Sequence, residues 1–202
     1  MEGATPNEAR GSLVASFGIV NEIKQNAWLV RSVPALVERV PDVSVALVGP
    51  CSDAERERLT KLAAELGVAD RVTVTGAVSG DEYDGWLDRA AVAVQLRRAA
   101  NGECSATVAD CLAAGSVPVV TGIGAMRDLP LDAVVQVSPE VGVAELAAVV
   151  GDLLVDPGRR GALAAAGRAY AASHTFAALA QRLYADVIEP AARSGLSVAR
   201  LR

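Results

Sequence analysis

The sequence predicts an α/β fold in which a six-stranded, mainly parallel sheet lies between two layers of helices. Short runs rich in valine alternate along the chain with longer amphipathic segments, an order that produces right-handed crossovers and a parallel sheet. The short runs are apolar almost without interruption, which is typical of strands buried on both faces. Ligands of such sheets bind at the carboxyl ends of the strands, where the strand order reverses.

Six segments have the composition of buried strands. They are residues 13–19, 43–48, 72–75, 92–96, 117–121 and 134–137. Pro118 stands at the start of its segment, where a missing N–H group costs little. The loops that follow these strands are therefore predicted to form the functional edge of the sheet.

The predicted helices have recognisable ends. Ser52 and Ser79 each precede a glutamate by three residues, which is the pattern of a capping box. A helix over residues 27–39 carries apolar residues at helical spacing, but Pro34 is expected to kink or interrupt it. Three helical segments follow the last strand. They are residues 143–155, 159–172 and 176–192.

Length and composition limit the class of protein. The 202 residues suffice for one domain with a full core, which we place at residues 12–195, between a flexible N-terminal tail (1–11) and a C-terminal tail (196–202). A formal net charge of −5 and only 3% aromatic residues argue against nucleic-acid binding. No apolar run is long enough for a transmembrane helix.

The cysteines and the one histidine give little support to a metal site. Cys51, Cys104 and Cys111 are odd in number and lack metal-ligand spacing. The first residues also lack the apolar core of a secretory leader. A reducing, cytoplasmic location is therefore the default expectation.

Residues 97–122 are the most informative stretch of the chain. A short helix is predicted from Ser105 to Gly115, so its free N–H groups, including those of Ala106 and Thr107, point toward whatever lies beside Glu103. Such a helix end attracts phosphate, and a neighbouring carboxylate accepts hydrogen bonds from hydroxyl groups. A nucleotide-sugar carries both.

The loop after the first strand indicates the same chemistry. Gly18 allows close approach of a ligand to the backbone, and Lys24, six residues later, can reach a phosphate. The alternative is a plain turn glycine and a solvated lysine. The loop is not a dinucleotide fingerprint, because G-x-G-x-x-G is absent.

Three further groups have alternatives of the same kind. Arg97 and Arg98 follow a predicted strand. They are either ligand-binding residues or ordinary surface arginines. Glu103 either faces ligand hydroxyls or stabilises the helix dipole. Asp110 is a poor helix former that either enters the site or lies solvated on the outer face.

These segments together resemble the C-terminal, donor-binding domain of retaining group 1 (GT4-like) glycosyltransferases, one Rossmann-like half of the GT-B fold. The resemblance spans residues 12–192, with six segments in the expected order. They are residues 17–24, 45–49, 72–78, 103–115, 118–122 and the helical tail. It implies a domain that binds a nucleoside-diphosphate-sugar, without a cofactor or a metal ion.

The resemblance also implies roles for single residues. Lys24, with Gly18 beside it, would contact the donor diphosphate, as would the N–H groups of Ser105, Ala106 and Thr107. The backbone around Val78 would hold the base. Asp110 would bind the ribose hydroxyls, and Glu103 the transferred sugar. No catalytic nucleophile is implied.

The chain departs from the family pattern at two places. The usual Glu-x7-Glu spacing is shortened to Glu103-x6-Asp110, with an aspartate in place of the second glutamate. Ile19 stands where an arginine is common, and Arg97 or Arg98 is expected to replace that cation.

The resemblance further implies a partner domain. In this family an acceptor-binding domain precedes the donor domain, so we expect this chain to need one and to transfer little sugar alone. Its apolar interdomain face is expected to permit self-association. The alternatives are a stand-alone nucleotide or sugar-phosphate module without catalysis, and an unrelated receiver-like or dehydrogenase-like protein.

Overall fold

Six strands form the central sheet of the computed structural model, which describes residues 6–100 and 104–193. Every pairing between neighbouring strands is parallel, and their spatial order is β3-β2-β1-β4-β5-β6. The strands are β1 (Leu13–Phe17), β2 (Ser44–Val48), β3 (Val72–Gly76), β4 (Val92–Gln95), β5 (Val117–Thr121) and β6 (Val135–Val137). The order reverses between β1 and β4. The predicted α/β sheet is confirmed.

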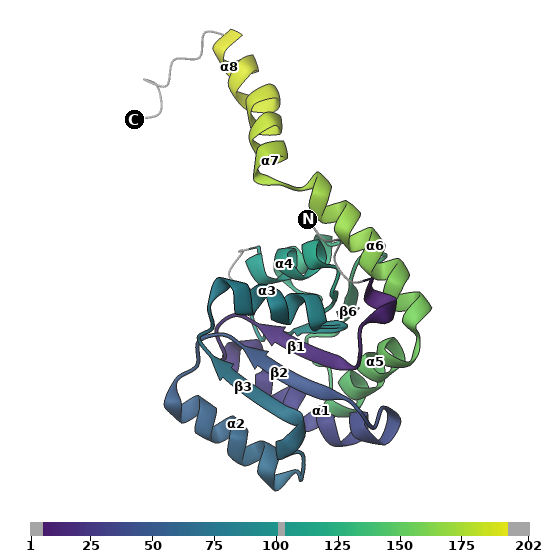
Figure 1. Cartoon of the computed structure of the whole chain (residues 1–202). Coiled ribbons are helices and arrows are strands. Elements are labelled where there is room, and N and C mark those ends of the chain that lie inside the picture. Colours follow the sequence, from purple (N-terminus) through teal and green to yellow (C-terminus); the bar gives the residue numbers. More distant parts are fainter. Residues whose placement is uncertain (1–5, 101–103, 194–202) are drawn as a thin grey trace.

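Helices cover both faces of this sheet (Figure 1). On one face α1 packs against α2 and α5, and on the other α4 packs against α3 and α6. The helices are α1 (Asn26–Arg39), α2 (Asp53–Glu65), α3 (Gly80–Arg89), α4 (Ala106–Ala114), α5 (Val143–Val155), α6 (Pro157–Ser173), α7 (Phe176–Leu183) and α8 (Glu189–Arg193). The four central strands are mostly apolar because both of their faces are buried, whereas the edge strand β3 alternates valine with threonine and is only half-buried.

The helix ends follow the predicted patterns in part. Ser79 forms the complete capping box, since its hydroxyl accepts from Glu82 N–H and the Glu82 carboxylate accepts from Ser79 N–H at 2.8 Å. Ser52 accepts from Glu55 N–H, but the Glu55 carboxylate turns to Arg58 at 2.7 Å. An ion pair therefore replaces the second half of that box.

Pro34 does not interrupt α1, so of the two effects expected from the sequence, a kink or an interruption, the interruption is wrong. The helix continues through it from Asn26 to Arg39. Its apolar side, with Leu29, Val33 and Leu36 fully buried, packs against α5. This burial outweighs the hydrogen bond that proline cannot donate.

Residues 7–10 are packed against the domain, in contrast to the flexible tail predicted over residues 1–11. Asn7 donates to the carbonyls of Ala91 (3.0 Å) and Gly115 (2.8 Å). The buried Arg10 donates to the last carbonyls of two helices. They are those of Leu87 in the last turn of α3, of Ala90 directly after it, and of Ala114 at the end of α4. The segment thus satisfies carbonyl groups that helix ends leave unpaired.

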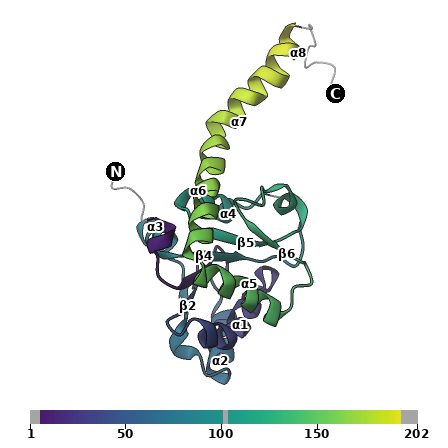
Figure 2. The same ribbon diagram turned by 90° about the vertical axis from the view of Figure 1, so that its right-hand side faces the viewer.

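The last helical segment extends away from the sheet (Figures 1 and 2). A π-helical turn (Tyr184–Ile188) joins α7 to α8, so the predicted segment 176–192 is helical throughout. Its apolar side chains are exposed, Phe176 by 92% and Leu179 by 62%. None of the helices in the described part of the chain is long and apolar enough to cross a membrane.

Candidate nucleotide site

The carboxyl ends of β1 and β4 meet at the point where the strand order reverses. Gly18 ends β1 with a φ of +94°, and its N–H donates to the Val48 carbonyl of β2 at 2.9 Å. Gly49, which ends β2 with a φ of +139°, lies directly against the Gly18 backbone. These conformations favour glycine, so the backbone turns away from the sheet here and leaves an open edge.

Gly18, Lys24 and Thr107 lie together at this edge. A Cβ atom at Gly18 would stand 2.6 Å from Lys24 Nζ and 3.0 Å from the Thr107 methyl group. The absence of a side chain at Gly18 therefore lets a lysine of the first loop approach the first turn of α4. Two segments far apart in the sequence are joined as predicted.

Lys24 is a partly buried cation held against the strand end. Its ammonium group donates to the Phe17 carbonyl at 2.5 Å. Burial, and secondarily the positive charge of Arg97, lower the pKa of Lys24 to about 8. Lys24 therefore lies in an environment that disfavours its charge, and an incoming anion would relieve this.

Arg97 and Ser105 flank the beginning of α4. The Arg97 guanidinium donates to Ser105 Oγ at 3.4 Å, and Ser105 Oγ lies 3.1 Å from Thr107 Oγ1. Ser105 begins α4 without capping it through its side chain. The N–H groups of Ala106 and Thr107, at the positive end of the helix dipole, therefore face the same edge of the sheet.

The two arginines point to different places. Arg97 lies beside Lys24 and Ser105, whereas Arg98 is exposed and lines a separate small cavity with Glu22, Gln25 and Arg58. Of the two arginines, Arg97 is the one that lies beside Lys24.

A pocket of about 290 Å³ continues from Gly18 toward α3. Most of its surface is apolar, and Val78, Tyr83 and Pro50 contribute to its wall. Val78 follows β3 and precedes the capping box of α3. An apolar pocket of this kind suits a flat, uncharged group such as a nucleobase.

Asp110 faces α3 rather than open solvent. The hydroxyl of Tyr83 donates to Asp110 Oδ2 at 2.9 Å. Burial, and then the bond to Asp110, raise the pKa of Tyr83, so the phenol keeps its proton. The alternative of a solvated outer position for Asp110 is wrong.

Three contributors to the site escaped prediction from sequence. Gly49 supports Gly18, and the buried Gln95 lies beneath the loop, with its amide oriented to bond both the N–H and the carbonyl of Phe17. Tyr83 joins the pocket to Asp110. Gly49 was detectable as a glycine after a buried strand. Glu103, the predicted sugar ligand, lies outside the described residues.

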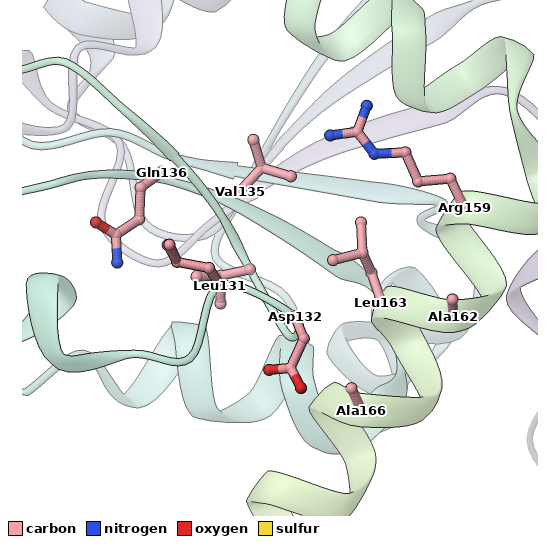
Figure 3. Close-up of a pocket in the computed structure, with 9 residues that line it drawn as sticks. Leu131, Asp132, Val135, Gln136, Arg159, Ala162, Leu163 and Ala166 are labelled. Atoms are coloured by element: carbon pink, nitrogen blue, oxygen red, sulfur yellow. The ribbon is translucent and has the colours of Figure 1, made fainter.

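A larger pocket, of about 570 Å³, lies elsewhere (Figure 3). It is formed between the β6 edge and α6, where Leu131, Val135 and Leu163 form an apolar wall near Asp132 and Arg159. None of the residues predicted for the site lines it. Within residues 6–100 and 104–193, no three His, Cys, Asp or Glu side chains gather to hold a metal ion.

Known proteins resemble this chain in sequence. It is 34% identical over 154 residues to a GDP-mannose-dependent alpha-(1-6)-phosphatidylinositol monomannoside mannosyltransferase of Mycolicibacterium smegmatis, covering 73% of this chain and 40% of the relative. It is 33% identical over 171 residues to a D-inositol 3-phosphate glycosyltransferase of Salinispora tropica, covering 80% of this chain and 35% of the relative. The chain thus spans less than half the length of either relative.

Solved structures share the fold. The C-terminal domain of a group 1 family glycosyl transferase (LpcC) from Francisella tularensis superposes with a TM-score of 0.73 at 14% identity, covering 86% of this chain and 93% of that one. Anabaena HepE in complex with UDP gives 0.75 at 17% identity, covering 91% and 50%. The family model "Glycosyl transferases group 1" matches residues 11–172. The chain therefore belongs to the group 1 glycosyltransferases.

Proposed function

We propose that this chain is the donor-binding domain of a retaining glycosyltransferase and binds a nucleoside-diphosphate-sugar. The observation that carries the proposal is that groups suited to a diphosphate, a ribose and a base lie next to one another beside the carboxyl ends of the strands. Lys24 and Arg97 lie at the start of α4, and Tyr83, which bonds Asp110 of the same helix, lines the apolar pocket together with Val78. A nucleotide carries these three parts in one molecule.

The chemistry follows from the charges at the first of these positions. In the transfer, the bond between the anomeric carbon of the sugar and the diphosphate oxygen breaks, a bond from that carbon to the oxygen of an acceptor hydroxyl forms, and the hydroxyl proton passes to the released diphosphate. The diphosphate leaves with the electron pair, so negative charge develops at its oxygen. Lys24, Arg97 and the N–H groups of Ala106 and Thr107 stabilise that charge without a metal ion.

A second domain would complete the enzyme. The chain spans 40% of the mycobacterial relative, which supports a separate acceptor-binding domain. The exposed apolar side of α7 and of the π-helical turn after it, with Phe176, Leu183 and Val187, would pack against it. The same side is available to a second copy when the chain is alone.

The test is a thermal-shift and ligand-observed NMR screen with UDP, GDP, ADP and TDP, with NAD as a control. We expect selective stabilisation by one nucleoside diphosphate. Replacing Lys24 with methionine (Lys24→Met) should weaken its binding about 10- to 100-fold, as for a lost charged hydrogen bond. Lys61→Met, at an exposed lysine of α2, is the matched control and should change nothing. Equal affinity in the two variants would contradict the assignment of Lys24.

The affinity for the diphosphate should also depend on pH. Lys24 has a pKa of about 8 in the free protein, and a bound anion stabilises its charged form, so binding takes up a proton above that pH. Raising the pH from 7.5 to 9.5, where phosphates are fully ionised, should weaken binding roughly 10- to 20-fold. Calorimetry at several pH values measures this, and Lys24→Met should show a flat profile.

A further inference from the structure

Tyr83 connects two parts of the site that the sequence treats separately. It comes from α3 and lies in the wall of the pocket that includes Val78. Its hydroxyl reaches across to Asp110 of α4, 27 residues later in the chain, at 2.9 Å. The ring packs edge-on against the fully buried Phe17, with the ring centroids 5.5 Å apart and the planes at 77°. Its position is therefore set by the core.

The hydrogen bond between Tyr83 and Asp110 has a defined direction. Because burial raises the pKa of Tyr83, the phenol is the donor and the carboxylate oxygen is the acceptor. The phenol oxygen then still has a lone pair, and Oδ1 of Asp110 accepts no hydrogen bond from the described residues. Two acceptor positions thus lie side by side, one on Tyr83 in the pocket wall and one on Asp110 next to it.

Two adjacent acceptors match two adjacent donors, as in a vicinal cis-diol. Asp110 is the ribose ligand that the family resemblance implies, and we propose that Tyr83 joins it as a positioning and specificity residue, with its phenol oxygen accepting from one hydroxyl of the ribose diol and Asp110 Oδ1 from the other. This inference rests on the proposed function. Asp110 is one methylene shorter than the glutamate of the family pattern. The Tyr83 phenol provides a second hydrogen-bond acceptor, which lies in the pocket wall.

The surrounding geometry agrees with this placement. Thr107 and Asp110 are three residues apart on α4 and so share one face of the helix. The Thr107 methyl group lies close to Gly18, and Gly18 also lines the pocket. The acceptor pair therefore lies between the start of α4 and the apolar pocket, where the ribose of a bound nucleotide would be.

The experiment compares ribonucleotides with nucleotides that lack the diol. Dissociation constants are measured by calorimetry for GDP and UDP and for their 2′,3′-dideoxy forms. Wild type should prefer the ribonucleotide tenfold or more. Tyr83→Phe keeps the ring and removes the hydroxyl, so it should lose most of this preference and bind the dideoxy form as wild type does. Asp110→Asn should behave similarly. Tyr184→Phe, at an exposed tyrosine, should retain the full preference.

The possible results separate the two proposals. Equal wild-type affinity for the ribonucleotide and its dideoxy form overturns the role of Tyr83 and Asp110, and leaves the proposed function standing. If Tyr83→Phe weakens the binding of the ribonucleotide and of its dideoxy form by the same factor, Tyr83 has a merely structural role, and the inference is also overturned. Wild type that binds none of the nucleotides overturns the proposed function and this inference together.

Discussion

Replacing Arg10 with alanine should lower the free energy of unfolding by about 3–5 kcal/mol. Arg10 is only 6% exposed, and its guanidinium donates to three carbonyl groups, those of Leu87, Ala90 and Ala114. In the alanine variant these helix-terminal carbonyls lose their donor in a buried place, and the arginine stem leaves a cavity.

Urea unfolding followed by circular dichroism measures this loss. Arg31→Ala is the control, because Arg31 is an exposed arginine of α1 and its replacement should stay within about 0.5 kcal/mol of wild type. Arg10→Lys keeps the charge but cannot present a planar fork, so it should recover only part of the loss. A change below about 1 kcal/mol in Arg10→Ala would show that water replaces the guanidinium.

Gly49→Ala should combine a large loss of stability with a loss of nucleotide binding. An added Cβ would stand less than 2.5 Å from the Gly18 carbonyl oxygen, and φ at Gly49 is +139°, a conformation that residues with a side chain rarely adopt. Both clashing groups are backbone in paired strands, so neither moves freely. We expect a cost of about 3 kcal/mol or more, and Gly18 displaced from Lys24 and Thr107.

Gly67 is a control that separates the backbone strain of a positive φ from the steric clash of an added Cβ. Gly67 also has a positive φ, +71°, but a Cβ there meets nothing within 4 Å. Gly67→Ala should therefore cost only about 1–2 kcal/mol, the penalty of the left-handed conformation, and leave nucleotide binding intact. Thermal unfolding and NMR titration with the same nucleotide check both variants. Equal effects at the two glycines would contradict a specific role of Gly49 at the site.

The strands are predictable from the sequence because helices cover both faces of the sheet. The central strands must then be mostly apolar, and segment 117–121 coincides with β5. The behaviour of Pro34 and of residues 7–10 is decided by tertiary contacts instead. Asn7, for example, bonds carbonyls that lie 84 and 108 residues further along the chain. No local pattern records such partners.

The site is predictable to a similar extent. Gly18 and Thr107 lie 89 positions apart in the sequence, yet the rule that parallel strands share one carboxyl edge brings them together. Tyr83 could not be predicted in this way. An aromatic residue on an amphipathic helix is usually a packing residue, and only the placement of α3 beside α4 shows that its hydroxyl reaches Asp110.

Helix α4 is about 13 Å long and has a different neighbour at each end. Its last carbonyl, that of Ala114, is held by Arg10, while its first N–H groups open the candidate diphosphate site. The N-terminal segment and the candidate site therefore lie at opposite ends of one helix. A tilt of α4 would carry Ala106 and Thr107 toward or away from Lys24, so the contact of Arg10 with the helix end also bears on the geometry of the site.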